Sequence, residues 1–187
     1  MSRATHTAPG VLLLVFAATL ASPSGATTDD CLAGICLSDT LSSVEKRIGR
    51  GHSFPPELEI THCFKVSEKG PYVSFVVSDE DPARPVMAVV ITDRPYCPSA
   101  SLHKALPPAA TCDGVSIGDS SEVVRKRHGE PMWQGSPHFP WSDAPAGIEQ
   151  WDYHCDDAVG LETYPAVTSI FFRDGFVIGV SIWSPDG

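Results

Sequence analysis

Residues 35–40 (ICLSDT) and residues 115–120 (VSIGDS) share the pattern that decides the predicted fold, and each comes directly before a stretch of helical character. The two stretches align without a gap, and the alignment continues into the helical stretch. Farther along, residues 61–63 (THC) resemble residues 153–155 (YHC). Landmarks that recur in the same order indicate internal repetition. The sequence therefore predicts two copies of one small unit.

A short helix is expected near the start of each unit. Asp39 and Asp119 are natural N-caps, because a carboxylate accepts hydrogen bonds from the free N–H groups of a first helical turn. In the first unit Leu41, Val44 and Ile48 recur at helical spacing, which predicts one buried face. Helices of about nine residues are marginal on their own. Each helix is therefore expected to pack on a sheet.

The remainder of each unit has the apolar runs and turn residues of antiparallel strands. Strands are predicted at residues 57–66, 72–78 and 86–92 of the first unit and at residues 148–155, 166–173 and 176–183 of the second. The predicted fold is α+β: two tandem copies of a short helix packed on a three- or four-stranded antiparallel sheet, stapled by disulfides. The units span residues 27–98 and 111–187, and residues 99–110 form a linker.

Residues 1–26 have the features of a cleavable signal peptide. Arg3 supplies an early positive charge, an apolar run follows at residues 11–21, and small residues stand at Ser24 and Ala26. The apolar run is too short to cross a bilayer, which needs roughly 20 residues. The mature chain is therefore expected to be periplasmic or secreted and not to span a membrane.

Charge and cysteine content narrow the partners and cofactors. The formal net charge of −10 argues against nucleic acid as a partner. An even number of cysteines in an exported chain favours disulfides over metal binding, so no cofactor and no metal are expected. The repeat predicts which cysteines pair. The expected disulfides are Cys112–Cys155 in the second unit, Cys31–Cys63 by equivalence in the first, and Cys36–Cys97 between the two that remain.

Residues 115–131 resemble the opening signature of the SmpA/OmlA small lipoprotein domain. Two uses of this pattern in one exported chain resemble the β-lactamase inhibitory protein family. The resemblance implies a short helical element on an antiparallel sheet, with a concave sheet face that meets a protein partner. The first unit departs from the pattern, since Ser38 stands where glycine is expected and Arg50-Gly51 replaces the Gly-x-Pro ending. The anchoring cysteine of the lipoproteins is also absent.

Two patterns raise the alternative of an enzyme. Residues 114–118 fit the G-x-S-x-G motif of serine hydrolases, with Ser116 as the nucleophile. The flanking apolar residues instead alternate as in a strand, which favours a structural role. His62 and His154 each precede a cysteine, and disulfide formation would remove that cysteine as a nucleophile or ligand. We expect no catalytic residues and no enzymatic activity.

The expected partner-binding residues fall into two groups, which have structural alternatives. The acidic turn Asp79, Glu80 and Asp81 could enter a partner's cleft, be simply solvated, or bind calcium. The long loop of residues 130–147 is rich in proline and aromatic residues and could bind a partner or fold back over the sheet. Its candidate residues, with their neighbours in the following strand, are Trp133, Phe139, Trp141, Trp151 and Tyr153.

The sequence is most consistent with a secreted or periplasmic protein-interaction module that inhibits an exported enzyme. One alternative is an accessory protein of envelope assembly or of the cell wall. A second alternative is a small hydrolase or ligand-binding protein. The sequence names no partner.

Overall fold

The computed structural model describes residues 31–54, 59–65, 70–78, 80–94, 101–102, 114–142, 144–154 and 166–185. The predicted signal segment, Asp79 and the cysteines Cys97, Cys112 and Cys155 lie outside these residues. Neither described helix, at eight residues each, is long and apolar enough to cross a membrane.

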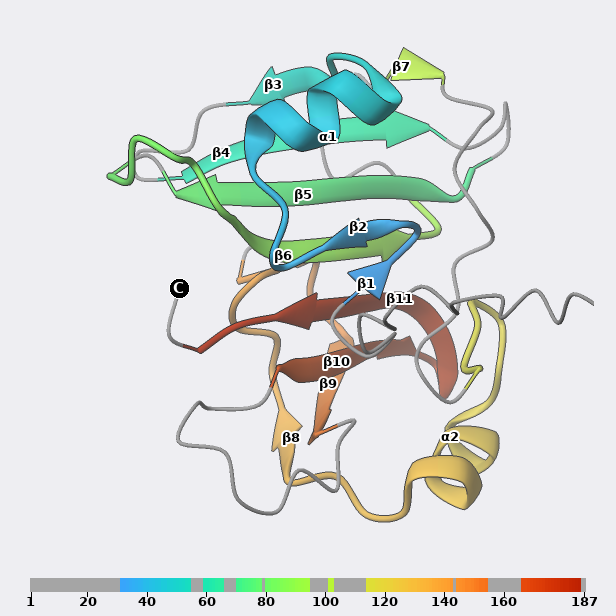
Figure 1. Cartoon of the computed structure of the whole chain (residues 1–187). Coiled ribbons are helices and arrows are strands. Elements are labelled where there is room, and N and C mark those ends of the chain that lie inside the picture. Colours follow the sequence, from blue (N-terminus) through green and yellow to red (C-terminus); the bar gives the residue numbers. More distant parts are fainter. Residues whose placement is uncertain are drawn as a thin grey trace, which may run out of the picture.

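Nine strands form one sheet (Figure 1). Its order is β3-β4-β5-β6-β11-β10-β9-β8, with antiparallel neighbours throughout, and β7 pairs parallel with β4. A separate hairpin consists of β1 and β2. The strands are β1 (Cys31–Leu32), β2 (Ile35–Cys36), β3 (His52–Phe54), β4 (Glu59–Lys65), β5 (Tyr72–Ser78), β6 (Val86–Thr92), β7 (Ser101–Leu102), β8 (Trp133–Gly135), β9 (Ile148–His154), β10 (Val167–Arg173) and β11 (Phe176–Trp183).

The predicted α+β fold with one sheet in each copy is wrong, because β6 and β11 pair directly and make one sheet. Their register runs from Ala88 opposite Trp183 to Thr92 opposite Gly179. Both strands are buried on both faces, so their backbone groups need hydrogen-bonded neighbours at both edges. Gly179 permits the close approach, since a Cβ there would lie 3.0 Å from the carbonyl oxygen of Ile91. With two short helices among the described residues, the protein is mainly β.

The helices are α1 (Leu41–Ile48) and α2 (Ser121–His128). Their N-caps are Thr40 and Ser120, so the prediction of Asp39 and Asp119 is wrong by one residue. The hydroxyl of Thr40 accepts a hydrogen bond from the backbone N–H of Ser43 at 3.3 Å. The hydroxyl one position after each aspartate therefore caps the helix, and the aspartate carboxylate is free to accept hydrogen bonds from other groups.

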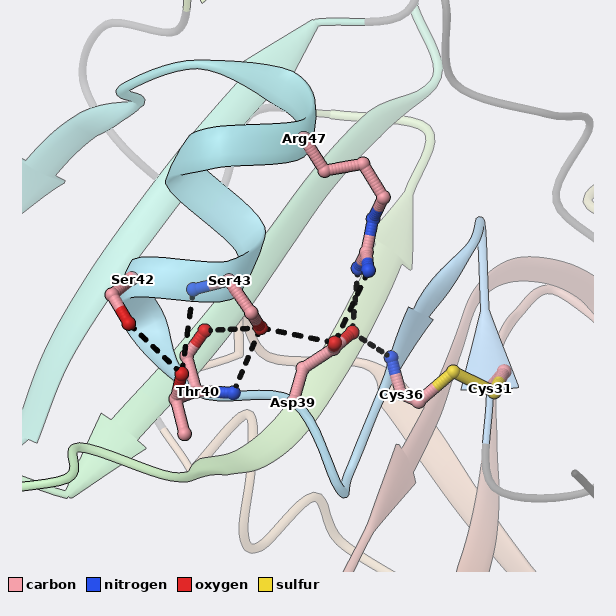
Figure 2. A network of polar contacts seen from close by, with 7 residues as sticks. All are labelled: Cys31, Cys36, Asp39, Thr40, Ser42, Ser43 and Arg47. Atoms are coloured by element: carbon pink, nitrogen blue, oxygen red, sulfur yellow. Dashed lines mark hydrogen bonds and ion pairs between the residues drawn. A yellow bond between two sulfur atoms is a disulfide. The ribbon is translucent and has the colours of Figure 1, made fainter.

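The carboxylate of Asp39 links α1 to the β1–β2 hairpin (Figure 2). It accepts hydrogen bonds from the backbone N–H of Cys36 at 2.9 Å, from the Ser43 hydroxyl at 3.1 Å and from Arg47 Nη2 at 2.5 Å. Burial by itself would raise the pKa of Asp39. The bonds from Arg47, Cys36 and Ser43 outweigh burial and hold that pKa below 3.8.

The second half of the chain holds α2 with matching contacts. Asp119 accepts hydrogen bonds from the backbone N–H of Ser116 at 3.1 Å and from Arg127 Nη1 at 3.0 Å. Its backbone carbonyl accepts from the N–H of Val177, as the carbonyl of Asp39 accepts from β6. These are geometric likenesses between two parts of one sheet. The division into two copies, with the boundaries given above, stays a prediction.

Strand pairing corrects one part of the alignment between the two halves. The β5–β6 and β10–β11 ladders each contain one register shift, after Val76 and after Phe171, and we take these two positions as equivalent. His62 lies opposite the residue before Val76, and Trp151 lies opposite the residue before Phe171, so His62 corresponds to Trp151. Cys63 then corresponds to Asp152, three positions before the cysteine that the sequence had suggested. The predicted match of residues 61–63 with residues 153–155 is therefore displaced.

The first disulfide also differs from the prediction. Cys31 and Cys36 face each other across the β1–β2 hairpin, with 4.0 Å between their Cα atoms, and form a disulfide with each other. Cys63 is disulfide-bonded as well. The predicted pairs Cys31–Cys63 and Cys36–Cys97 are therefore wrong, and the third predicted pair lies outside the described residues.

The main core lies on the face of the sheet that carries α1 and the β1–β2 hairpin, which lie in front of the strands in Figure 1. Val44 and Ile48 of α1 and Val124 of α2 enter it. Its largest fully buried members are Leu32, Ile35, Phe64, Phe75, Ile91, Ile170 and Phe172. Strand residues that alternate with these face the opposite side, where the candidate site lies.

Candidate functional site

The loop of residues 136–147 folds back over the face of β9, β10 and β11 that points away from the main core. Trp141 is 7% exposed and packs edge-on against Phe171, with 5.2 Å between the ring centroids. Ile148 and Ile178 complete this second apolar cluster with Val90. Trp141 therefore belongs to the packing beneath the loop and not to the exposed surface.

Gln150 of β9 holds the loop in place from below. Its side chain is fully buried, and its Oε1 accepts a 2.9 Å hydrogen bond from the backbone N–H of His138. Its Nε2 donates to Asp152 Oδ1 at 2.8 Å and to Ser169 Oγ at 3.1 Å. Ser169 Oγ also accepts from the indole N–H of Trp183 at 2.9 Å. One buried amide thus joins the loop to β9 and β10, and Ser169 extends the network to β11.

Asp152 and His138 form a polar pair at the boundary between this network and solvent. His138 Nε2 lies 3.2 Å from Asp152 Oδ2, and the two side chains are 40% and 3% exposed. A hydrogen bond here requires the proton on Nε2, an assignment made from the network. A carboxylate that orients an imidazole is also a part of many catalytic sites. Among the described residues, however, no Ser, Thr or Cys side chain is hydrogen-bonded to His138.

Four rings gather at this pair, with the imidazole of His138 among them, and we call them the aromatic surface: Trp133, His138, Phe139 and Trp183. The centroid of His138 lies 4.4 Å from that of Trp133 and 6.0 Å from that of Trp183, and Phe139 lies 5.4 Å from Trp183. All three contacts are edge-to-face. Trp133 is 39% exposed, on the short edge strand β8. The rings therefore form a continuous, partly exposed group.

Gly135 sets the position of Trp133. The two residues lie on the same face of β8, and a Cβ at Gly135 would be 2.7 Å from Cζ2 and 2.9 Å from Cη2 of the indole. Any side chain at this position would displace the ring. The glycine therefore allows the indole to lie along its own strand.

Trp151 and Tyr153 point to the other face of the sheet and are 3% and 4% exposed. Trp151 packs against Phe172, and the guanidinium of Arg125 lies 4.6 Å from its ring centroid. Burial raises the pKa of Tyr153 to about 12, because the phenolate would be poorly solvated there. These two aromatic residues belong to the main core and not to the aromatic surface.

The acidic turn precedes β6 and lies apart from Trp133 of the aromatic surface. Glu80 and Asp81 are exposed, and Asp79 is outside the described residues. Asp81 Oδ1 accepts a 2.8 Å hydrogen bond from the backbone N–H of Ala83, so this carboxylate stabilises its own turn. Trp183 lies at the same end of the sheet on the neighbouring strand β11, whereas Trp133 lies on β8, four strand positions or about 19 Å from β6. The structure does not bring the two predicted groups together.

The residues that suggested catalysis are also separate. Ser116 lies in the turn before α2, and its backbone N–H donates to Asp119. His154 is exposed at the end of β9, whereas His62 is 5% exposed beneath α1 and stacks on Phe75 at 4.9 Å. Within the described ranges, no three His, Cys, Asp or Glu side chains gather in a way that could hold a metal ion.

Sequence reasoning missed His138, Gln150, Asp152 and Ser169 as members of the site. A signal was present in residues 150–153 (QWDY), where polar and aromatic residues alternate. On a strand, this alternation predicts one polar and one apolar face. This alternation predicts that Trp151 and Tyr153 face the core while Gln150 and Asp152 face the polar network on the other side of the sheet.

Comparisons with known proteins add little to this geometry. No family model matches the chain, and no curated protein matches it. Among solved structures, the chain is similar to a putative β-lactamase inhibitor protein from Streptococcus mutans, at 11% identity over 75% of this chain and 80% of that one, with a TM-score of 0.24. At that TM-score, no property of the S. mutans protein is carried over to this chain.

Proposed function

We propose that this chain is a secreted or periplasmic protein-interaction module that binds a protein partner through the aromatic surface. We further propose that the bound partner is an exported enzyme and that binding inhibits it. The observation that carries the proposal is the position of Trp133, which is 39% exposed on an edge strand and fixed from several sides. Binding, and not catalysis, is the activity proposed for this site.

The physical support is that the surface is rigid and aromatic. Tryptophan and other aromatic residues contribute most to binding when they present a large area without losing much side-chain freedom. Trp133 lies against Gly135 and His138, and Trp183 is held through its N–H by Ser169. These rings would lose little conformational entropy when a partner covers them.

The test is capture of a partner from the native envelope and culture fluid by the mature protein. Trp133→Ala should abolish capture. Phe176→Ala is the matched control, since Phe176 is 56% exposed and begins β11 at the opposite end of the sheet from Trp183. Capture that survives Trp133→Ala, or that is lost equally in both variants, would contradict the proposal.

Inhibition is tested separately on the captured protein. The catalytic activity of the identified partner should fall when the parent chain is added, with a dose dependence that follows binding. Trp133→Ala should restore it. Binding without any loss of the partner's activity would leave the interaction and remove the inhibitory role.

A further inference from the structure

We infer that the aromatic surface binds a cationic side chain, arginine or lysine, supplied by the partner. The inference rests on the proposed function and specifies the chemistry of its partner. Its first support is the rings themselves, because the face of an aromatic ring is electron-rich and attracts a cation. The four rings are linked by three contacts, and Trp133 and Trp183 both lie against His138, so a cation could reach the faces of neighbouring indoles.

The second support is the carboxylate beneath the rings. Asp152 is 2% exposed, and its carboxylate accepts a hydrogen bond from the uncharged amide of Gln150 at 2.8 Å and lies 3.2 Å from His138 Nε2. A negative charge held close to a partly desolvated surface acts over several ångströms with little screening. It would favour a cation on the rings and repel an anion.

The third support is that no basic side chain of the described residues makes a cation–π contact with the aromatic surface. The cation–π contacts found in that part of the chain are Lys65 over Tyr72 and Arg125 over Trp151. Trp151 lies on the opposite face of the sheet from Trp133. Among the described residues, a basic side chain lies over the buried ring of Trp151 and none lies over the exposed ring of Trp133.

The net negative charge of the whole chain also favours a cationic partner. A formal net charge of −10 attracts cationic partners over long distances and raises their association rate. Arginine suits the site particularly, because its planar group stacks on indole rings and is weakly hydrated.

The test uses N-acetyl-arginine amide as the probe and N-acetyl-citrulline amide as its neutral, nearly isosteric control. Each is titrated into the mature protein while the indole N–H resonances of the four tryptophans are recorded by NMR. We expect arginine to shift the Trp133 and Trp183 resonances saturably, at least about fivefold more tightly than citrulline. The buried Trp141 and Trp151 serve as internal references and should not move.

Asp152→Asn separates the charge from the rings. The new amide can still accept from Gln150 and can donate to His138, so the fold should be retained. Arginine affinity should fall about fivefold, whereas citrulline affinity should not change. If the variant fails to fold, the comparison of arginine with citrulline on the parent protein still decides the inference.

The outcomes separate this inference from the proposed function. Equal binding of both probes, or shifts from neither, would overturn the inference, and Trp133-dependent capture of a protein would then still support the interaction module. Arginine-specific shifts without Trp133-dependent capture would instead contradict the proposed function, on which the inference depends. Arginine-specific shifts together with that capture would support both.

Discussion

The side-chain oxygen of Gln150 accepts a 2.9 Å hydrogen bond from the backbone N–H of His138, and this contact joins the long loop to the sheet. The same amide donates to two other buried side chains, so its removal would leave several polar groups unpaired at once. The position of the aromatic surface therefore depends on a residue that no partner would touch.

Gln150→Leu should lower the free energy of unfolding by about 3 kcal/mol, because buried donors and acceptors would lose their partners. Urea unfolding followed by tryptophan fluorescence measures this. The control is Gln134→Leu on the neighbouring strand, where the lost partner is the solvent-accessible Glu149 and the expected loss is below about 0.5 kcal/mol. Equal losses in both variants would contradict the role given to Gln150.

Gly135→Ala should weaken partner capture without unfolding the protein. The added Cβ would meet the indole of Trp133 at 2.7 Å, so the ring must move. Gly135 is not among the positive-φ glycines, so the strand itself accepts alanine. Capture should fall about tenfold, and the free energy of unfolding should change by less than about 1 kcal/mol. Gln134→Ala, whose side chain points to the other face, should bind as the parent does.

His62 should make the protein less stable in acid. Burial lowers the pKa of His62 below 6.5, with a smaller opposing effect from Glu45 and a further lowering by Arg84. The folded state therefore takes up this proton less readily than the unfolded state. Stability is full above pH 6.5 and falls as the pH drops from 6.5 toward the lowered pKa of the folded state, by at most about 1.4 kcal/mol per pH unit.

His62→Phe should remove this part of the pH dependence while keeping the stacking on Phe75. The free energy of unfolding is measured across pH 4.5 to 7.5 in small steps, a window of about 3 units around the ordinary histidine pKa. His154→Phe, at an exposed position, is the control and should leave the pH profile unchanged. An unchanged profile in His62→Phe would show that another group dominates.

Replacing Cys31 and Cys36 together by serine should lower the free energy of unfolding by about 2 kcal/mol, the value expected for a short closed loop. The residues are five positions apart in sequence. Mass spectrometry of the unreduced, digested protein should find both cysteines in one internally bridged peptide. A peptide that joins either of them to Cys63 would contradict the observed pairing.

Much of the local structure was accessible from the sequence, because it depends on local chemistry. The stripe of Val44 and Ile48 predicted α1, and the apolar runs placed the six long strands within about two residues, since burial imposes their periodicity. Apart from the N-caps, which were placed one residue too early, the errors are non-local. No pattern within β6 or β11 states which strand lies beside it, and so the joining of the two sheets could not be predicted.

The candidate site was predictable only in part. Aromatic residues marked the loop, but the sequence does not state which ring turns outward: Trp133 is exposed, whereas Trp141 is buried. The difference arises from packing against Phe171 and from the glycine beside Trp133. The polar residues beneath were missed because their role depends on strand neighbours distant in sequence.

The pairing of β6 with β11 has a consequence for how the chain can be divided. Each of these strands protects the other's row of backbone donors and acceptors, while the outermost strands β3 and β8 have only three residues each. A fragment ending before α2 would leave the valine-rich strand β6 uncovered along its length, which is a template for association between chains. Folding and solubility are thus properties of the whole sheet, and its two ends cannot be separated without creating a surface prone to aggregation.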